Sequence, residues 1–284
     1  MTELLGKPVA DSINEQLSIT IKELKDSGTI PTLAVVRVGA REDDLSYERG
    51  LLKKFDSMEC KVNVFELPVE CTQGDLEELI NTLNSDDKTH GILMFRPLPK
   101  HLSEERIKMI INPSKDVDSM GTASLATVFA GSGEGYPPCT AQAVMEILKY
   151  YNIELKGKKV TVIGRSLVIG KPVAMMLIKE NATVTVCHTK TVDTPSECRN
   201  ADIIVAAAGV AKMVTKEYVR EGQIVIDVGM NVDENGKLCG DVNFSEVSEI
   251  VDAITPVPRG VGSVTTSVLL KHVVEGALKS TKKQ

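Results

Sequence analysis

Residues 160–172 read Val160-Thr-Val-Ile-Gly-Arg-Ser-Leu-Val-Ile-Gly-Lys-Pro172. The apolar run, the two glycines and the closing proline predict a buried strand, a tight turn and the first turn of a helix. This geometry places a phosphate group at a helix amino terminus, where free backbone N–H groups and the helix dipole favour anions. The spacing departs from the G-x-G-x-x-G fingerprint, because Gly164 is followed by Arg165 and Ser166 and the next glycine is Gly170. An arginine therefore stands where the phosphates of a dinucleotide would lie.

Strand-like and helix-like segments alternate on both sides of this turn. The expected strands are residues 32–38, 61–67, 91–95, 160–163, 183–187, 202–207 and 224–228, and the expected helices are 9–24, 45–58, 74–83, 141–150 and 265–279. Such alternation predicts an α/β fold with parallel sheets covered on both faces. The turn-rich segment Gly131-Ser-Gly-Glu-Gly-Tyr-Pro-Pro138 is the best candidate boundary between two domains.

Composition narrows the class of protein. The chain has 284 residues, 42% of them hydrophobic and 25% charged, which suits a globular protein of roughly two domains. Its net charge of −6 argues against a nucleic-acid or membrane-surface partner. No apolar run approaches the roughly 20 residues that span a bilayer, and the start of the sequence lacks the layout of a signal peptide. Six scattered cysteines predict reduced thiols, no metal site and a cytoplasmic location.

The second strand of the later series bears on the choice of cofactor. In a Rossmann-type unit an acidic residue after this strand binds the ribose 2′-hydroxyl of NAD. Here Thr183–Cys187 is followed by His188-Thr-Lys-Thr191, which contains no acid. Arg165, Thr189 and Lys190 can instead bind a 2′-phosphate, so the sequence favours NADP. NAD stays open as the alternative, as does the interpretation of Lys190 as a solvated surface charge.

Several motifs, in order along nearly the whole chain, resemble the methylenetetrahydrofolate dehydrogenase/cyclohydrolase family. They are Lys115-Asp-Val-Asp118, Pro138-Cys-Thr140, Gly164–Pro172, Thr183–Thr191, Ile224-Val-Ile-Asp-Val-Gly-Met-Asn231, Gly240-Asp-Val242 and Thr255-Pro-Val-Pro258. The resemblance implies two α/β domains with a cleft between them. Residues 1–139 with 265–284 would form the folate-binding catalytic domain, and residues 140–264 a doubly wound, Rossmann-type NADP-binding domain.

The resemblance also implies an activity and a set of site residues. The family oxidises 5,10-methylenetetrahydrofolate to the methenyl form with NADP, most members then hydrolyse it to 10-formyltetrahydrofolate, and the molecule is usually a homodimer. The implied cofactor-binding residues are Thr140, Gly164, Arg165, Ser166, Gly170, His188, Thr189 and Met230. The implied substrate-binding residues are Tyr47, Phe95, Pro97, Leu98, Asp118, Pro258, Arg259 and Gly260, with catalytic roles for Tyr47 and Asp118. Lys54 is a further catalytic candidate because of its place on the same helix, not because of the resemblance.

The substrate half departs from the family pattern at its catalytic lysine. The family carries a lysine four residues after the tyrosine, on the same helix face, whereas this chain has Leu51 four residues after Tyr47. A leucine can neither donate a proton nor polarise a water molecule. Lys54 lies near the same face and is a candidate replacement, although Lys53 and Lys54 also fit ordinary solvated lysines.

Other family positions have changed as well. Phe95 replaces the glutamine that works with that lysine, Ser119 replaces the glycine after Asp118, and Arg259 replaces a glycine near the folate. We expect the dehydrogenase activity to be kept and the cyclohydrolase activity to be lost or weak. Two alternatives stay open: a fully bifunctional enzyme, and a folate- or nucleotide-binding protein without catalysis. A generic short-chain oxidoreductase is disfavoured because no Tyr-x-x-x-Lys pair follows the nucleotide motif.

Overall fold

The computed structural model describes residues 1–281, which divide into two compact units. One unit comprises Met1–Asp11 with Pro138–Thr265, and the other comprises Ser12–Pro137 with the segment that begins at Thr266. We call them the six-stranded unit and the three-stranded unit after their main sheets. The division differs at the amino terminus from the expected one, because β1 (Thr2–Glu3) pairs with a strand of the six-stranded unit.

The six-stranded unit has a parallel sheet in the order β1-β11-β8-β7-β5-β6. Its further strands are β5 (Lys159–Ile163), β6 (Thr183–Cys187), β7 (Ile203–Ala206), β8 (Ile224–Asp227) and β11 (Ala253–Ile254). The chain runs outward from β5 to β6 and then crosses back to β7. The strand order therefore reverses between β5 and β7, and at such a switch point doubly wound sheets bind ligands beyond the carboxyl ends of the strands.

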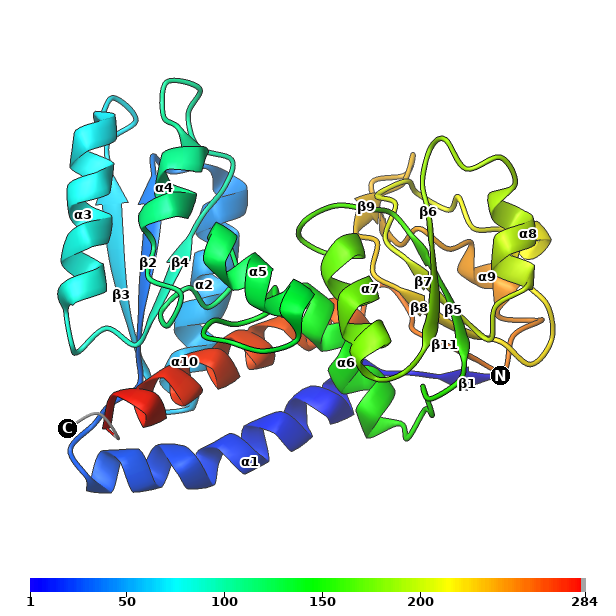
Figure 1. Ribbon diagram of the computed structural model, residues 1–284, viewed down its shortest axis with the longest axis horizontal. Coiled ribbons are helices and arrows are strands. Elements are labelled where there is room, and N and C mark those ends of the chain that lie inside the picture. Colours follow the sequence, from blue (N-terminus) through cyan, green and yellow to red (C-terminus); the bar gives the residue numbers. More distant parts are fainter. Residues whose placement is uncertain (282–284) are drawn as a thin grey trace. The chain divides into compact units, whose positions relative to one another are not determined.

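Helices cover both faces of this sheet, α6 (Cys139–Tyr150) and α7 (Gly170–Lys179) on one side and α8 (Thr194–Arg199) and α9 (Phe244–Val247) on the other (Figure 1). The apolar core under α8 and α9 includes Ile163, Cys198, Ile204, Val225 and Val247, all nearly inaccessible to solvent. An antiparallel pair, β9 (Asn231–Val232) and β10 (Leu238–Cys239), and two short 3₁₀ turns, Lys216–Tyr218 and Val261–Ser263, complete the unit.

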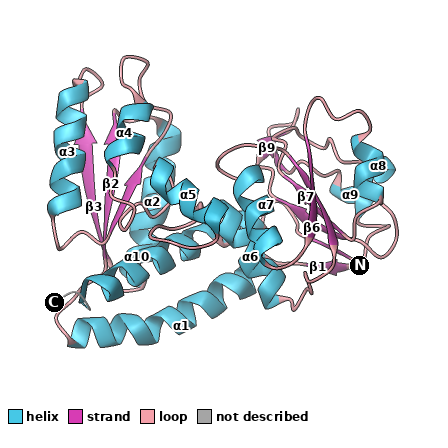
Figure 2. Ribbon diagram, viewed as in Figure 1, coloured by secondary structure: helices cyan, strands magenta, loops and turns pink. Residues whose placement is uncertain are grey.

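The three-stranded unit has a parallel sheet in the order β3-β2-β4, formed by β3 (Lys61–Leu67), β2 (Thr32–Val38) and β4 (Gly91–Met94). The strands of this sheet are drawn in magenta in Figure 2. An isolated parallel bridge from Ile92 to Asp116 extends the sheet. Its helices are α2 (Glu42–Ser57), α3 (Gln73–Ser85), α4 (Glu104–Ile110), α5 (Thr122–Ala130) and α10 (Thr265–Thr281). Helix α1 (Gly6–Asp26) begins in the six-stranded unit and continues in this one.

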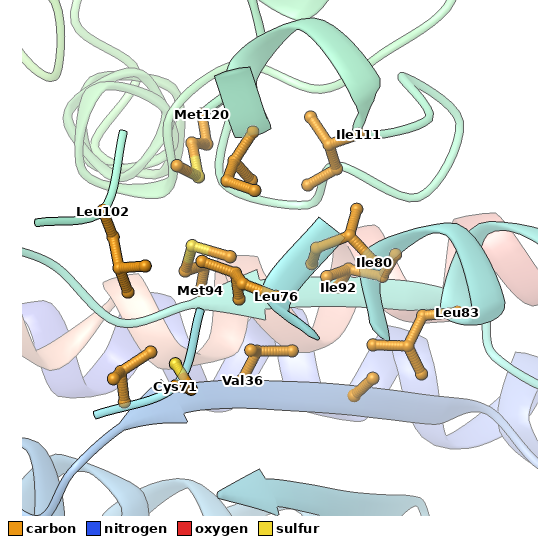
Figure 3. Close-up of a cluster of buried hydrophobic side chains, with 13 residues drawn as sticks. Val36, Cys71, Leu76, Ile80, Leu83, Ile92, Met94, Leu102, Ile111 and Met120 are labelled. Carbon is orange, nitrogen blue, oxygen red and sulfur yellow. The ribbon is translucent and has the colours of Figure 1, made fainter. Parts of the chain in front are cut away.

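Both faces of β2 are buried, and Arg37 is the one charged residue of the strand. Ala34, Val36 and Val38 belong to one buried apolar cluster with Leu76 and Ile80 of α3. Figure 3 labels Val36, Leu76 and Ile80 within this core. Because successive side chains of a strand point to opposite faces, Arg37 lies on the other face. Two short helices, α4 and α5, were not expected from the sequence, since their apolar stretches are too short to show a helical period. No helix within residues 1–281 is long and apolar enough to cross a membrane.

Candidate functional site

The glycine turn after β5 is built on two close backbone contacts. Gly164 has φ +118°, and a Cβ there would lie 2.1 Å from the carbonyl oxygen of Ala207. A Cβ on Gly170 would lie 2.2 Å from the carbonyl oxygen of Gly164. Both positions therefore require glycine, and the unusual spacing of the motif follows from this packing of turn, helix start and neighbouring strand end.

The residues between the two glycines form an anion-binding arrangement. Ser166 Oγ accepts the N–H groups of Ile169 and Gly170, at 3.1 and 3.5 Å, at the start of α7. Arg165 is exposed, and within residues 1–281 its guanidinium has no acceptor. The predicted cofactor residues Gly164, Arg165, Ser166 and Gly170 thus lie together at the carboxyl end of β5, with a cation available to a phosphate.

The turn after β6 lies at the same edge of the sheet, since β6 is paired with β5 along its length. His188 Nδ1 accepts the N–H of Lys190 at 3.1 Å, and the N–H of His188 donates to Thr191 Oγ1 at 2.9 Å. This ring nitrogen is therefore engaged within the turn, whereas Thr189 and Lys190 are exposed. Elsewhere in the unit, Thr140 is half-buried in the first turn of α6, and the side chain of Met230 is 69% exposed.

Two buried carboxylates near this edge were not identified as functional from the sequence. Asp241 accepts the N–H groups of Ala208, Gly209 and Val210 at 2.6, 2.9 and 2.9 Å. Asp227 accepts the N–H groups of Gly229, Asp241 and Val242 at 2.9, 3.0 and 3.0 Å. Burial raises the pKa of Asp227 to about 7, although these three N–H groups act in the opposite direction. The sequence signal for each acid was its place in a short motif, Ile224–Asn231 for Asp227 and Gly240-Asp-Val242 for Asp241.

Residues 258–260 also belong to the six-stranded unit. Pro258 and Arg259 are exposed, whereas Gly260 is buried and a Cβ on it would lie 2.4 Å from the carbonyl oxygen of Pro256. Arg259 has φ +85° and its guanidinium lies 3.7 Å from the carboxylate of Glu3. The remaining predicted substrate residues are in the three-stranded unit, so the structure does not gather the predicted set within one unit.

In the three-stranded unit, α2 presents Tyr47 next to an apolar partner. The ring of Tyr47, 42% exposed, lies 5.7 Å from the ring of the buried Phe95, with 43° between the planes. Leu51, one helical turn after Tyr47, is fully buried. The two positions at which the family carries a polar lysine and glutamine are therefore both taken by packed apolar side chains.

An ion network lies beneath the same helix. The guanidinium of buried Arg37 donates to Glu48 of α2 and to Glu66 of β3, both at 2.8 Å, and to the carbonyl oxygen of Gly39 at 2.6 Å. The hydrogen bond to Glu66, followed by the contacts with Glu48, raises the pKa of Arg37, so it stays charged and cannot act as a proton donor. A charged residue inside the apolar run 32–38 was the sequence signal for this network.

Asp118 is carried on a turn that other buried groups hold in shape. Asp116 accepts the N–H groups of Met120 and Gly121 at 2.9 and 2.8 Å, and burial raises its pKa. His272 Nδ1 lies 2.7 Å from the carbonyl oxygen of Val117. Asp118 itself is half-buried, and the next residue, Ser119, has φ +55°. The turn thus keeps a backbone conformation that favours glycine although glycine is absent.

The remaining predicted residues of the three-stranded unit lie in the loop after β4 and near the end of α2. Pro97 and Leu98 follow β4, and the guanidinium of Arg41, just before α2, lies 3.4 Å from the carbonyl oxygen of Pro97. Lys54 is half-buried on α2, whereas Lys53 is exposed. No group of three or more potential metal ligands occurs in the part of the chain that the structure describes.

Comparison with known families places both parts of the chain in one group. Residues 4–118 match the model of the tetrahydrofolate dehydrogenase/cyclohydrolase catalytic domain. Residues 138–281 match the model of the NAD(P)-binding domain of the same enzymes.

Individual proteins give the same result over the full length. The bifunctional protein FolD of Carboxydothermus hydrogenoformans is 55% identical over 274 residues, 96% of each chain. The solved structure of the bifunctional FolD enzyme of Campylobacter jejuni has a TM-score of 0.95 and 42% identity, covering 98% of this chain and 99% of that one. The FolD enzyme of Trypanosoma brucei, solved with NADP cofactor and inhibitor, has a TM-score of 0.92 and 35% identity, covering 99% of both chains.

Proposed function

The chain belongs to the tetrahydrofolate dehydrogenase/cyclohydrolase family, and we propose that its two activities are unequal. It is an NADP-dependent methylenetetrahydrofolate dehydrogenase whose methenyltetrahydrofolate cyclohydrolase activity is weak or lost. The observation that carries this proposal is the replacement of the polar pair beside Tyr47 by the buried side chains Leu51 and Phe95.

The cofactor side of the proposal rests on the edge of the six-stranded sheet. NADP supplies the hydride acceptor when it is bound, and the residues that would hold it are those of the Gly164–Gly170 turn and the turn after β6. Arg165 provides an exposed guanidinium, and Thr189 with Lys190 provides exposed polar groups at the neighbouring strand end. The absence of an acid there removes the repulsion that a 2′-phosphate would meet.

The two reactions make different demands on the substrate side. Hydride transfer needs the reacting carbon to be held and oriented, and the nitrogen atoms of the folate stabilise the cation that forms. Asp118, on its braced turn, is suited to hold the pterin ring by hydrogen bonds. Hydrolysis in addition needs an activated water and proton transfers, which a fully buried leucine and a phenyl ring do not provide.

A fully bifunctional enzyme is the second candidate function. The names of the relatives from Carboxydothermus hydrogenoformans and Campylobacter jejuni favour it, since both describe bifunctional proteins. In that case Lys54, half-buried two turns after Tyr47, would supply the missing amine.

Parallel assays of methylene oxidation and methenyl hydrolysis, with spontaneous hydrolysis subtracted, separate the two functions. We expect oxidation at an ordinary rate and hydrolysis reduced by about 10²–10⁴-fold relative to a bifunctional relative, which is the usual contribution of general acid–base groups. Lys54→Ala should leave this residual hydrolysis unchanged. Hydrolysis as fast as that of the relative, and lost in Lys54→Ala, would establish the bifunctional alternative.

Substitution of the family's lysine at Leu51 and glutamine at Phe95 tests which of the two side chains hydrolysis requires. Leu51→Lys alone places an ammonium group in a fully buried position and should cost stability. Leu51→Lys with Phe95→Gln should raise hydrolysis well above the wild-type level, because the amide can bind the new amine. Leu52→Lys, which adds the same charge at an exposed neighbouring position, is the matched control and should change neither reaction.

Cofactor choice, location and assembly complete the proposal. Arg165→Ala should weaken NADP binding by about 10- to 100-fold, the value of one or two hydrogen bonds to a charged group, and NAD binding much less. Equal losses would show that Arg165 does not contact the 2′-phosphate.

We further propose that the protein is a cytoplasmic homodimer. The cytoplasmic location is supported by the six cysteines, which are free and buried, as in proteins of reducing compartments. The dimer rests on the family resemblance and is tested by sedimentation.

A further inference from the structure

We propose that Asp241 is a positioning residue for NADP: it holds the loop after β7, residues 207–212, in the shape that the nucleotide requires, without touching the nucleotide itself. This inference rests on the cofactor proposed above and not on the balance of the two activities. It assigns a role to a buried acid that lies outside both sets of expected site residues.

The loop lies at the switch point of the six-stranded sheet. The N–H of Ala207 donates to the carbonyl oxygen of Ile163, at the end of β5, at 2.8 Å. The space for a Cβ on Gly164 is filled by the carbonyl oxygen of Ala207. The loop after β7 therefore directly adjoins the glycine turn, and a shift of its backbone changes the crevice in which doubly wound sheets bind nucleotides.

The side chain of Asp241 makes three of its four hydrogen bonds to this loop. One carboxylate oxygen accepts the N–H groups of Ala208 and Gly209, and the other accepts those of Val210 and the Asn231 side chain, the last at 2.9 Å. Its side chain is fully buried. Three consecutive backbone N–H groups form a concave site that suits an anion. Because Asp241 already occupies this site, the phosphates of the nucleotide are directed to the turn at Ser166 and Gly170.

Asp241 is itself held from behind. Its own N–H donates to Asp227, and its carbonyl oxygen accepts the N–H of Val214 at 2.9 Å. A Cβ on Gly229 would lie 2.3 Å from Asp241 Oδ1, and a Cβ on Gly240 would lie 1.8 Å from Asp227 Oδ2. Asp227 and Asp241 thus link the end of β8 to the loop through hydrogen bonds, and glycine stands at each point where a carboxylate approaches the backbone closely.

Asp241→Asn tests the role with minimal change of shape. An asparagine presents its NH₂ group to one of the two pairs of N–H donors, so that pair loses its acceptor and meets another donor. We expect the Kd for NADP, measured by calorimetry, to rise by about 10- to 100-fold. We expect the KM for methylenetetrahydrofolate to stay within about twofold. Hydrogen exchange of residues 207–214 should become faster in the variant, and NADP should restore protection.

Asn231→Ala and Asp202→Asn complete the design. Asn231→Ala removes one of the four hydrogen bonds to Asp241 and should raise the Kd for NADP by a smaller factor; it also serves as the test if Asp241→Asn does not fold. Asp202, which accepts the N–H of Lys159 at the amino edge of the same sheet, is the control, and Asp202→Asn should leave the Kd unchanged. An unchanged Kd in folded Asp241→Asn, or in Asn231→Ala where Asp241→Asn does not fold, would overturn the inference. A wild-type protein that binds no NADP would instead overturn the proposed cofactor.

Discussion

The two sheets end in edges of very different chemistry. At the carboxyl edge of the six-stranded sheet, glycines and buried carboxylates fix the backbone through short contacts, as at Gly164 and Asp241. In the three-stranded unit, two positions that depart from the family pattern, Leu51 and Phe95, are filled by packed apolar side chains. An edge held by backbone contacts tolerates almost no substitution, whereas packed side chains can be exchanged without a change of fold. This difference explains how the two family positions beside Tyr47 can carry apolar side chains without a change of fold.

Gly164→Ala should have the largest effect, because it adds a Cβ where 2.1 Å separates that position from a backbone oxygen. We expect a loss of NADP binding and a destabilisation of about 3–5 kcal/mol, as for severe overpacking with backbone strain. The control is Gly157→Ala, where φ is also positive, +75°, but the space around a Cβ is open. It should cost about 1 kcal/mol in thermal unfolding and leave binding intact. Equal losses in the two variants would mean that φ alone, and not the contact with Ala207, requires glycine.

Arg37→Met tests the ion network of the three-stranded unit and should have the second-largest effect. It leaves Glu48 buried without its cation, which should cost about 3–5 kcal/mol in urea unfolding. Glu48→Gln should cost less, about 1–2 kcal/mol, because Arg37 keeps Glu66 and the carbonyl oxygen of Gly39. The Kd for NADP should not change in the folded fraction of either variant. A change in that Kd would break the comparison, since the two edges would then be coupled.

The raised pKa of Asp227 should make the stability of the protein depend on pH. Its pKa is raised in the fold to about 7, above the unfolded value of about 3.9, so the native state binds more protons between these limits. The unfolding free energy should therefore fall as pH rises from about 4 to 7, by at most about 1.4 kcal/mol per unit from this group. Asp227→Asn should lack this slope when its denaturation midpoints are measured across the same range. If the unfolding free energy of Asp227→Asn falls with pH as steeply as that of the wild type, other groups must cause the pH dependence.

Arg259→Gly should give the smallest change in the free energy of unfolding, and this change should be an increase. Arg259 has φ +85°, and a left-handed conformation costs a residue with a Cβ about 1–2 kcal/mol. Glycine removes this cost but loses more chain entropy on folding, so we expect a net stabilisation of about 0.5–1 kcal/mol. Arg259→Ala keeps the Cβ and should give no gain, which separates backbone strain from the loss of the exposed ion pair with Glu3. Ser119→Gly is the matching change in the three-stranded unit.

Sequence reasoning identified local elements far better than the contacts between distant residues. The strands at 61–67 and 183–187 were predicted with their observed bounds, since β-branched runs between turn residues are a local signal. The Gly164–Gly170 turn was also visible as a pattern. Asp241 was not assigned a role, because its partner Ala208 is 33 residues away and nothing local marks the acid as buried. Arg37 was missed for the same reason, since Glu48 and Glu66 come from two different elements.

Each unit is assembled from two separate stretches of chain, and this imposes an order on biosynthesis. Residues 12–137 leave the ribosome early, but their unit also needs α10, where a Cβ on Gly276 would lie 2.4 Å from the carbonyl oxygen of His90 and His272 meets Val117. The amino-terminal strand β1 must likewise wait for β11. Neither unit can close until nearly the whole chain has been made, so folding during translation must pass through states in which both cores are incomplete.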